Sequence, residues 1–268
     1  MFDLDAGMLI VEKLYQGRVL AHLQESDPTV VARATPSARL WLTQDMFEPL
    51  LRQNASKYSS EQRFGQTVVH YEEVEDGVIV IVQDVETHAL KKYKTKYLVA
   101  SDGNRSATRQ KEGIAWNGPG SITNSISINF TANLAPYLGE RAVHGTTYIA
   151  NPKVNGGFRL EKQGQAGFMI VTKAEGFENG FEPDSVSERE AARFFRDATG
   201  IEDDIGLKIT SISYWTVAAY CAERFTSKQG RVFIMGDAAH VMPPTGGMGG
   251  NTGVQVRLFC PVHPQNCR

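Results

Sequence analysis

A glycine-rich segment that follows a short apolar stretch holds the residues best suited to binding chemistry. Residues 231–235 form the apolar stretch, and Gly236-Asp237-Ala-Ala-His240 comes directly after it. A strand that leads through a glycine-dense turn into a helix exposes backbone N–H groups to an anion. Asp237 can accept a hydrogen bond from a sugar hydroxyl but does not suit a phosphate, since both are anionic. The segment therefore predicts a site for a nucleotide that has both ribityl and pyrophosphate parts.

A plainer interpretation of this segment is a glycine-rich surface loop without function. The strand before it and the helix start after it favour the binding site instead. His240 is tempting as a general base, but the sequence shows no acidic partner near it. We interpret it as a satisfied, structural histidine at the end of a strand.

A second polar turn follows another apolar stretch, Tyr97–Ala100. Asp102-Gly103 begins this turn, and a helix-compatible stretch follows it. Asp102 can cap that helix, while Arg105 and Arg109 offer positive charge for a phosphate. Taken alone, an Asp-Gly pair is about as often an ordinary turn.

The elements that position these turns can be read from hydrophobic periodicity. Helices are expected at 43–55, with Thr43 as N-cap, and at 187–198, where Ser187 and Glu190 form a capping box. A hairpin is expected at 66–82, turning at Glu75–Gly77. Further strands are expected at 94–100, 121–130, 146–171 (with breaks at Asn151-Pro152 and Asn155–Gly157), 207–219 and 231–235. A helix beginning at Asn251 is expected to stop after Gln255.

Composition excludes several classes of partner. The 268 residues carry a net charge of −2, with 41% hydrophobic and 22% charged residues. Without a long run of one charge, nothing indicates nucleic acid or an anionic membrane as partner. The apolar runs, such as Met8–Val11, are far shorter than the roughly 20 residues of a membrane span. The N-terminus has no basic region of the kind that opens a secretory signal.

The three cysteines do not make a disulfide framework, so a reducing, cytoplasmic compartment is expected. Cys260, His263 and Cys267 have a spacing that resembles a metal site. Three ligands without a partner pair do not make a structural zinc site, however. We therefore expect no metal.

The two turns resemble the motifs of a known family. Asp102-Gly-x-x-Ser106-x-x-Arg109 resembles the Asp-Gly motif of class A FAD-dependent aromatic monooxygenases. Gly236-Asp237-Ala-Ala-His240, followed by Pro244, Gly247 and Asn251, resembles their Gly-Asp motif. The family includes para-hydroxybenzoate hydroxylase, phenol hydroxylase and the polyketide hydroxylases, and the last two are the nearest in character. The resemblance covers most of residues 40–255.

The resemblance implies a cofactor site and a reaction. Asp237 would bind the ribityl chain of FAD, and Asp102 would contact the same cofactor. Gln44 would touch the flavin from its helix. With NAD(P)H as electron donor and O2 as oxidant, one oxygen atom would pass to a small aromatic substrate. No side chain need act as a nucleophile, so no catalytic residue is assigned. The residues expected along the isoalloxazine and pyrophosphate are Pro244, Gly246, Gly247, Gly249, Gly250 and Asn251.

The implied fold is α/β: an incomplete doubly wound FAD-binding domain joined to an antiparallel-sheet substrate domain, as in para-hydroxybenzoate hydroxylase. The FAD-binding part would comprise 40–115 and 226–255, and the substrate domain 116–225. Residues 256–268 would form an unrelated tail. Strand residues of the middle region would line the substrate pocket, although ordinary packing is the more frequent role of each: Tyr148, Arg159, Phe168, Tyr214 and Trp215.

The sequence departs from the family at both ends. Residues 1–60 lack the Gly-x-Gly-x-x-Gly of a βαβ unit, which holds the pyrophosphate. We therefore expect an N-terminally truncated chain with weak affinity for FAD, and a frameshift or retained intron beginning at Val256. Three functions stay open: a phenol or polyketide hydroxylase, the same flavin chemistry turned to epoxidation or Baeyer–Villiger insertion, and a non-catalytic relic or partner-binding scaffold.

Overall fold

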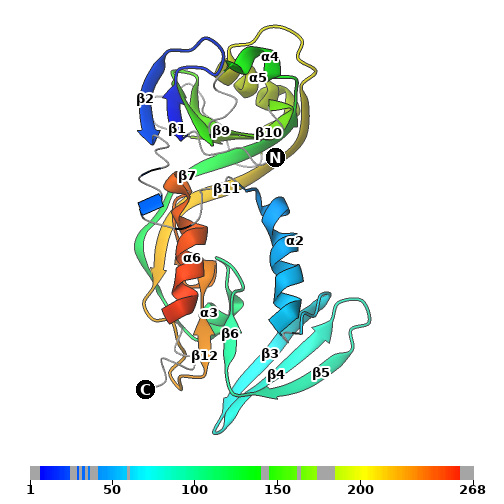
Figure 1. Cartoon of the computed structure of the whole chain (residues 1–268). Helices are drawn as coiled ribbons and strands as arrows, with labels where there is room; N and C mark the ends of the chain where they lie inside the picture. Colours follow the sequence, from blue (N-terminus) through cyan, green and yellow to red (C-terminus); the bar gives the residue numbers. More distant parts are fainter. Residues whose placement is uncertain are drawn as a thin grey trace. The chain divides into compact units, whose positions relative to one another are not determined.

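The chain divides into two compact units. In the computed structural model the first unit comprises Met1–Gln53 and Thr123–Thr216, and the second comprises Asn54–Ile122 and Val217–Arg268. Two long strands, β7 (Trp116–Thr131) and β11 (Lys208–Ala222), contribute residues to both units (Figure 1). The structure describes residues 7–24, 29, 32–33, 36, 42–58, 61–139, 145–161, 164–173 and 185–259.

The first unit is built around a mainly antiparallel sheet of eight strands. Its strand order is β13-β11-β7-β10-β9-β8-β1-β2. Only β1 runs parallel to its neighbour β8 among the registers described. The strands expected from the sequence at 121–130 and 207–219 are confirmed as parts of β7 and β11. The remaining bounds are β1 (Met8–Val11), β2 (Val19–Gln24), β8 (Thr146–Asn151), β9 (Val154–Glu161), β10 (Ala166–Thr172) and β13 (His240–Val241).

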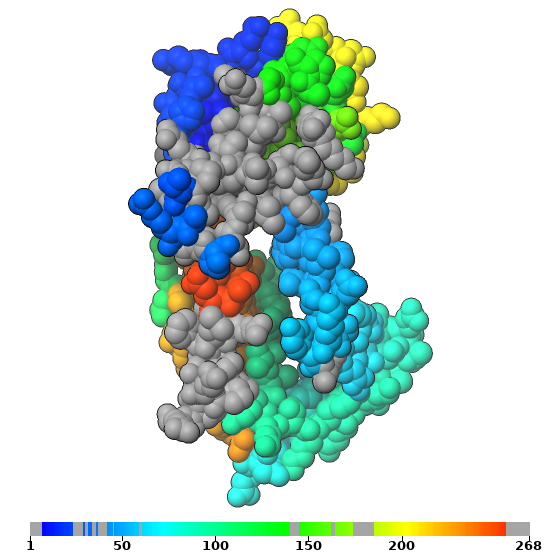
Figure 2. Space-filling view, viewed as in Figure 1, coloured from blue at the N-terminus to red at the C-terminus, as the bar shows by residue number. Residues whose placement is uncertain are grey.

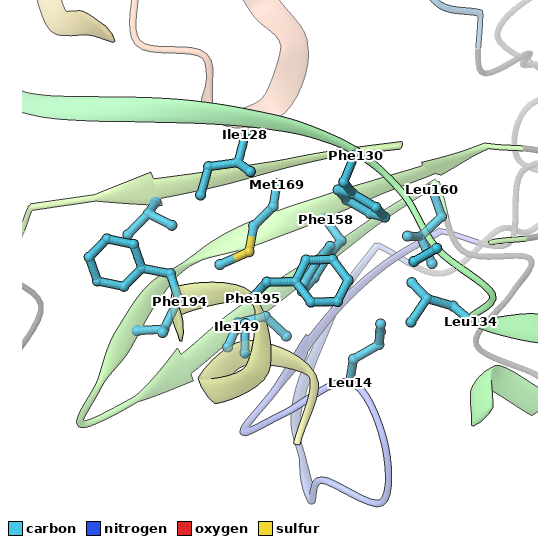
Figure 3. Close-up of a cluster of buried hydrophobic side chains, with 14 of the residues drawn as sticks. Leu14, Ile128, Phe130, Leu134, Ile149, Phe158, Leu160, Met169, Phe194 and Phe195 are labelled. Atoms are coloured by element: carbon cyan, nitrogen blue, oxygen red, sulfur yellow. The ribbon is translucent and has the colours of Figure 1, made fainter. Parts of the chain in front are cut away.

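Helix α5 (Glu188–Thr199) buries one apolar face in the first unit. The predicted capping box is confirmed: Ser187 Oγ accepts from the Glu190 amide, and the Glu190 carboxylate accepts from the Ser187 amide. Phe195 is fully buried, with its ring centroid 4.7 Å from Phe130 and 5.6 Å from Phe158 (Figure 3). The edge-to-face arrangement of these rings adds to the stabilisation from burial.

The expected break at Asn155–Gly157 is wrong, because β9 runs through it without interruption. One of its glycines, Gly156, is required by the packing of the sheet. A Cβ at Gly156 would lie 2.0 Å from the carbonyl oxygen of Ile170 on β10. Gly156 therefore permits a close approach of neighbouring strands, a common use of glycine within a sheet.

An antiparallel three-stranded sheet belongs to the second unit. Its strands are β3 (Gln66–Val74), β4 (Gly77–Asp84) and β5 (Leu90–Thr95). Val74 pairs with Gly77, which confirms the predicted hairpin turn. Tyr71, Val78 and Val80 pack with Val232 in a small buried cluster that ties the hairpin to β12.

The strand expected over 94–100 is two strands in different sheets. Its basic half ends β5 at Thr95, and its apolar half forms β6 (Leu98–Ala100). β6 pairs in parallel with β12 (Val232–Ile234), with Leu98 opposite Val232 and Ala100 opposite Ile234. The apolar residues pair with the buried strand β12, whereas the lysines lie on β5, an exposed edge strand. Charged side chains on an edge strand discourage pairing with a further strand.

Helix α2 (Gln44–Ala55) confirms the helix predicted at 43–55, with Pro49 in its interior. Its apolar side chains are at the surface, and Figure 2 shows this helix (light blue) uncovered on the viewed side. None of the described helices is long and apolar enough to cross a membrane.

Candidate cofactor site

The parallel pair β6 and β12 brings the two polar turns to one edge of their sheet. The Met235 amide donates to the Ala100 carbonyl over 2.9 Å, at the end of both strands. The Asp102 turn leaves β6 there, and the Gly236 turn leaves β12 there. The carboxyl ends of parallel strands are where α/β proteins bind ligands. The structure thus joins two segments that are distant in the sequence.

The glycine-rich segment forms a series of short turns that leads into a helix. A 3₁₀ turn, η4 (Gly236–Ala238), precedes β13, and a second, η5 (Thr245–Gly247), runs into helix α6 (Met248–Phe259). Gly236, Gly246 and Gly247 have φ angles of +60°, +82° and +65°. These values favour glycine, because the Cβ of any other residue is strained there.

The surface of this loop is open. A Cβ at Gly236 or Gly247 would meet nothing within 4 Å, and neither would one at Gly249 or Gly250. The Pro244 carbonyl accepts from the Gly247 amide over 3.0 Å, and Asn251 Nδ2 donates to the Gly247 carbonyl over 2.8 Å. Pro244 and Asn251 therefore hold the loop's shape, while its glycine backbone faces free space.

Helix α6 corrects the prediction for this end of the chain. It begins at Met248, before the predicted start, and continues past Gln255 to Phe259. Pro261, the first proline of the tail, disfavours helical backbone at the residue before it but not further upstream. It therefore does not prevent α6 from continuing past Gln255. Cys260, His263 and Cys267 lie outside the described residues, so the metal-like spacing is not addressed.

Asp237 offers a carboxylate that no described side chain or backbone group engages. It is exposed and takes part in no hydrogen bond or ion pair with the described residues. It lies in η4, directly after the buried strand β12. An acceptor that the protein leaves unpaired is available to a hydroxyl of a ligand.

Asp102 is occupied by the protein itself. Its Oδ2 accepts from the Thr108 amide over 3.0 Å, at the start of helix α3 (Ala107–Lys111). Partial burial alone would raise the pKa of Asp102, but hydrogen bonds from Ser106 and Thr108 outweigh burial and lower that pKa. The N-cap of α3 is Ser106 and not Asp102: the Ser106 hydroxyl accepts from the Arg109 amide over 2.9 Å, and the Asp102 carboxylate adds a second acceptor for the first turn.

The two arginines of this turn differ. Arg105 is exposed, whereas the guanidinium of Arg109 lies 4.2 Å from the centroid of the Trp116 ring and donates to the Ile114 carbonyl over 2.9 Å. Arg109 is thus engaged inside the second unit by a cation–π contact. Of the two arginines expected to bind a phosphate, Arg105 is the one whose side chain is exposed to solvent.

Comparison with known proteins identifies the fold. The model of the FAD binding domain family matches residues 10–257. The chain belongs to this family. It is 33% identical over 259 residues to the 4-methyl-5-nitrocatechol 5-monooxygenase of Burkholderia sp, covering 94% of this chain and 45% of that protein. It is also 33% identical over 257 residues to the aklavinone 12-hydroxylase of Streptomyces peucetius, covering 93% and 50%.

Solved structures of flavin-dependent hydroxylases share this fold. A ternary complex of aklavinone-11 hydroxylase with FAD and aklavinone superimposes with a TM-score of 0.82 at 29% identity, covering 92% of this chain and 46% of that one. The flavin-dependent monooxygenase PieE, in complex with FAD and substrate, gives a TM-score of 0.78 at 26% identity, covering 93% and 43%. The resemblance to aromatic and polyketide hydroxylases is thereby confirmed. The chain spans about half the length of these relatives.

The glycine loop of this FAD binding domain chain suits such a nucleotide. Its backbone is open at the glycines where an added Cβ would meet nothing, and Asp237 presents a free acceptor.

One further group, His240, was misjudged from the sequence. His240 is only 6% exposed, yet neither Nδ1 nor Nε2 has a partner among the described residues. Its burial was predicted, but the hydrogen bonds expected to satisfy it are not found there.

Gln44 lies in the first unit, on α2, where its side-chain amide donates to Glu48. Its expected contact with the flavin stays a prediction. No group of three or more metal-binding side chains occurs among the described residues.

The middle-region side chains separate onto two faces of the large sheet. Arg159 and Phe168 are direct partners across β9 and β10, so they share a face, opposite to the buried Phe158 and Met169. Tyr214 instead packs against the buried core, and its hydroxyl bonds to the Val186 backbone. The other two expected residues are Tyr148, opposite Gly157 on β9, and Trp215, whose indole donates to Ser127.

Proposed function

We propose that this chain is part of an FAD-dependent, NAD(P)H-using monooxygenase that hydroxylates a phenolic or polyketide-type aromatic compound. The observation that carries the proposal is the open glycine loop Gly236–Asn251, which follows the parallel strand β12 and presents the free carboxylate of Asp237. The relatives support it, since their names describe monooxygenases and hydroxylases of nitrocatechol and aklavinone.

The loop would act by binding and orientation. Asp237 would accept a hydrogen bond from a ribityl hydroxyl, and backbone amides of 246–251 would face the pyrophosphate and the ring system. When bound, FAD supplies the redox chemistry, taking electrons from NAD(P)H and activating O2. A cytoplasmic location, where NAD(P)H is available, belongs to the same proposal.

The half-buried face of the large sheet would receive the aromatic substrate. Phe168 and Tyr148 offer ring surfaces, and Arg159 offers positive charge on the same face. Aromatic rings stack favourably on such side chains. The face opposite is filled by the core around Phe195, so it leaves no room for a ligand.

A titration of this chain with FAD, followed by the oxidation of NADH and NADPH in the presence of catechols and anthracyclinone-type phenols, tests the proposal. Saturable FAD binding and a product heavier by one oxygen atom are expected. Absence of FAD binding would contradict the cofactor assignment. NMR of the product locates the added oxygen and so separates ring hydroxylation from epoxidation and Baeyer–Villiger insertion, which all give the same mass.

A second candidate function is that of a partner-binding scaffold, which the surface of α2 favours. Leu50 and Leu51 of this helix are 53% and 59% exposed, and exposed apolar side chains in a cluster mark interaction sites. Size-exclusion chromatography with light scattering tests this alternative. A L50E/L51E variant that keeps FAD binding but loses self-association or aggregation would support it.

A further inference from the structure

Two polar side chains of strand β7 lie on the face of the large sheet that is turned away from the core. Side chains alternate between the two faces of a strand, and those of Ile128 and Phe130 point into the core (Figure 3). Ser127 and Asn129 therefore lie on the opposite face, which the proposed function assigns to the substrate. Asn129 pairs with Phe168 of β10, so a ring surface lies directly beside its amide.

Each of the two polar side chains is held in place by a residue of β11. The Trp215 indole donates to Ser127 Oγ over 2.9 Å, and Asn129 Nδ2 donates to Ser211 Oγ over 2.9 Å. All four residues belong to the first unit. A side chain that is already held by such a bond loses less conformational freedom when a ligand binds, so both are preorganised for recognition.

Both side chains keep hydrogen-bonding groups that no described residue uses. An amide carries two N–H donors and a carbonyl acceptor, and a hydroxyl both donates and accepts. The bond to Ser211 engages one donor of Asn129 and leaves its Oδ1 and its second N–H. Ser127 accepts from Trp215 and still has its O–H to donate. Both residues are half-buried, so a ligand on this face can reach them.

Ser125, on the same face of β7, shows how a solely structural polar residue differs from these two. Its hydroxyl shares a hydrogen bond with that of Thr172 over 3.0 Å, and the residue is only 1% exposed. Its polar group is therefore paired and closed to a ligand. Ser127 and Asn129 are paired on one side only and remain accessible on the other.

The spacing and the charge of Ser127 and Asn129 define the kind of ligand that fits. Two residues along an antiparallel strand correspond to about 6.8 Å, which is farther apart than two neighbouring hydroxyls of a single ring. No charged side chain takes part in the bonds that hold the two residues, so they suit neutral oxygen substituents. The ring of Phe168 beside them suits an aromatic framework.

We propose that Asn129 and Ser127 are specificity-determining residues, which select a fused-ring aromatic compound with neutral oxygen substituents on two of its rings. Asn129 Oδ1 accepts from a hydroxyl of one ring, and the Ser127 hydroxyl donates to an oxygen of the other. The inference rests on the proposed function and deepens it, because it narrows the substrate to fused-ring hydroxyaromatics. A site that bonds a hydroxyl discriminates against the analogue without one, whose binding leaves the polar group unpaired.

A set of variants and small aromatic probes tests the inference. Asn129→Leu removes the hydrogen-bonding groups at similar size, and Asn129→Asp keeps an oxygen acceptor. Asn124→Leu is the matched control, because Asn124 lies on the other face of β7 and likewise bonds to β11, where Thr216 donates to it over 3.1 Å. The probes are a naphthalenediol with one hydroxyl on each ring, naphthalene and catechol. Dissociation constants are measured by ¹H–¹⁵N NMR titration without FAD.

The effect of each substitution should depend on the hydroxyls of the probe. The unchanged chain should bind the naphthalenediol more tightly than naphthalene or catechol. N129L should weaken binding of the diol about ten-fold and that of naphthalene by less than about two-fold. N129D should keep most of the preference for the diol, and N124L all of it.

Three results would overturn the inference. Equal weakening of diol and naphthalene binding in N129L would show that Asn129 acts in packing alone. Undiminished affinity of N129L for the diol would exclude the hydrogen bond. Catechol binding as tight as that of the diol would exclude selection of a fused ring.

A measurement on the unchanged chain covers the case in which N129L does not fold. The ¹³C signal of the Asn129 side-chain carbonyl is assigned by through-bond correlation to its own backbone. It should move to higher shift with the diol but not with naphthalene, and an unmoved signal at saturating diol would overturn the inference. Failure to bind FAD, with the preference for the diol intact, would overturn the proposed function alone. Failure to bind the diol would overturn the inference and leave the FAD assignment standing.

Discussion

The Asp102 carboxylate accepts a hydrogen bond from the Thr108 amide over 3.0 Å and so fixes the turn after β6 to the start of α3. The first amides of a helix have no partner within it. Asp102→Ala should therefore lower the unfolding free energy by about 1 kcal/mol, and Asp102→Asn by less, since its oxygen still accepts. Amide exchange at Thr108 measures the effect, and equal exchange in D102A and the unchanged chain would contradict it.

The same contact predicts a pH dependence. Burial alone would raise the pKa of Asp102, but the hydrogen bonds from Ser106 and Thr108 prevail and hold that pKa below its ordinary value of 3.8. Because the folded pKa is lower than the unfolded one, the stabilisation is complete above the unfolded pKa. It is lost as the pH falls through the folded pKa. The NMR shift of the Thr108 amide should titrate with a midpoint below 3.8 and should not titrate in D102N.

Asp237, unlike Asp102, should contribute little to stability and should instead contribute to FAD binding. Its exposed carboxylate bonds to no described residue, so Asp237→Ala should change the unfolding free energy by less than about 0.5 kcal/mol. A hydrogen bond to a charged acceptor contributes about 1.5–3 kcal/mol, so the FAD dissociation constant should rise roughly ten- to a hundred-fold. Fluorescence titration measures the affinity, and Asp203→Ala, on the first unit, serves as control. A stable variant with undiminished affinity would exclude Asp237 from the cofactor site.

Substitutions at two glycines of the loop should change stability in opposite directions, whereas both should weaken FAD binding. Gly249 has helical backbone and open space around a Cβ, so Gly249→Ala should stabilise α6 by up to about 1 kcal/mol. Gly247 has a φ of +65°, so Gly247→Ala should cost about 1 kcal/mol through backbone strain. Both variants place a methyl on the proposed cofactor surface and should weaken FAD binding several-fold. If G249A binds FAD as tightly as the unchanged chain, the cofactor does not approach this part of the loop.

Local chemistry made several of these features predictable. The capping box at Ser187 and the hairpin turn at Gly77 depend on residues a few positions apart, so the sequence alone indicates them. The Gly236 loop is recognised from residue types at close spacing, and its approach to Asp102 follows once both turns are placed after parallel strands.

Features decided by distant strands were not predictable in the same way. The lysine-rich and apolar halves of 94–100 separate because β12 pairs only with the second half. Arg109 turns to Trp116, whose position depends on β7 rather than on the turn. The missing partners of His240 concern the tertiary surroundings, which no local pattern encodes.

Adjacent glycines of β9 give a matched test of such a non-local constraint. A Cβ at Gly156 would lie 2.0 Å from the Ile170 carbonyl oxygen, whereas one at Gly157 would lie no closer than 3.3 Å to any atom. Gly156→Ala should therefore cost about 3 kcal/mol or more of unfolding free energy, and Gly157→Ala under about 1 kcal/mol. Urea unfolding of the two variants measures the difference. Similar costs would show that β9 and β10 can separate without penalty.

Tyr71 joins the β3–β4 hairpin to the end of α3, because its hydroxyl donates to Glu112 over 2.7 Å. Burial, and then this bond to a carboxylate, raise the pKa of Tyr71 above its ordinary value of 10. A raised folded pKa means that the stabilisation is complete below the unfolded pKa and is lost as the pH rises toward the folded one.

Tyr71→Phe should consequently cost about 1–2 kcal/mol at pH 8 and less at pH 11, where the unfolded state of the unchanged chain gains by ionising this tyrosine. Urea unfolding at both pH values measures the change, and Tyr58→Phe, at an 81% exposed tyrosine, is the control. The cost of Y71F should shrink with pH while that of Y58F stays near zero. A cost that is equal at the two pH values would mean that Tyr71 ionises as readily in the folded protein as in the unfolded chain, and the bond to Glu112 would then not govern its titration.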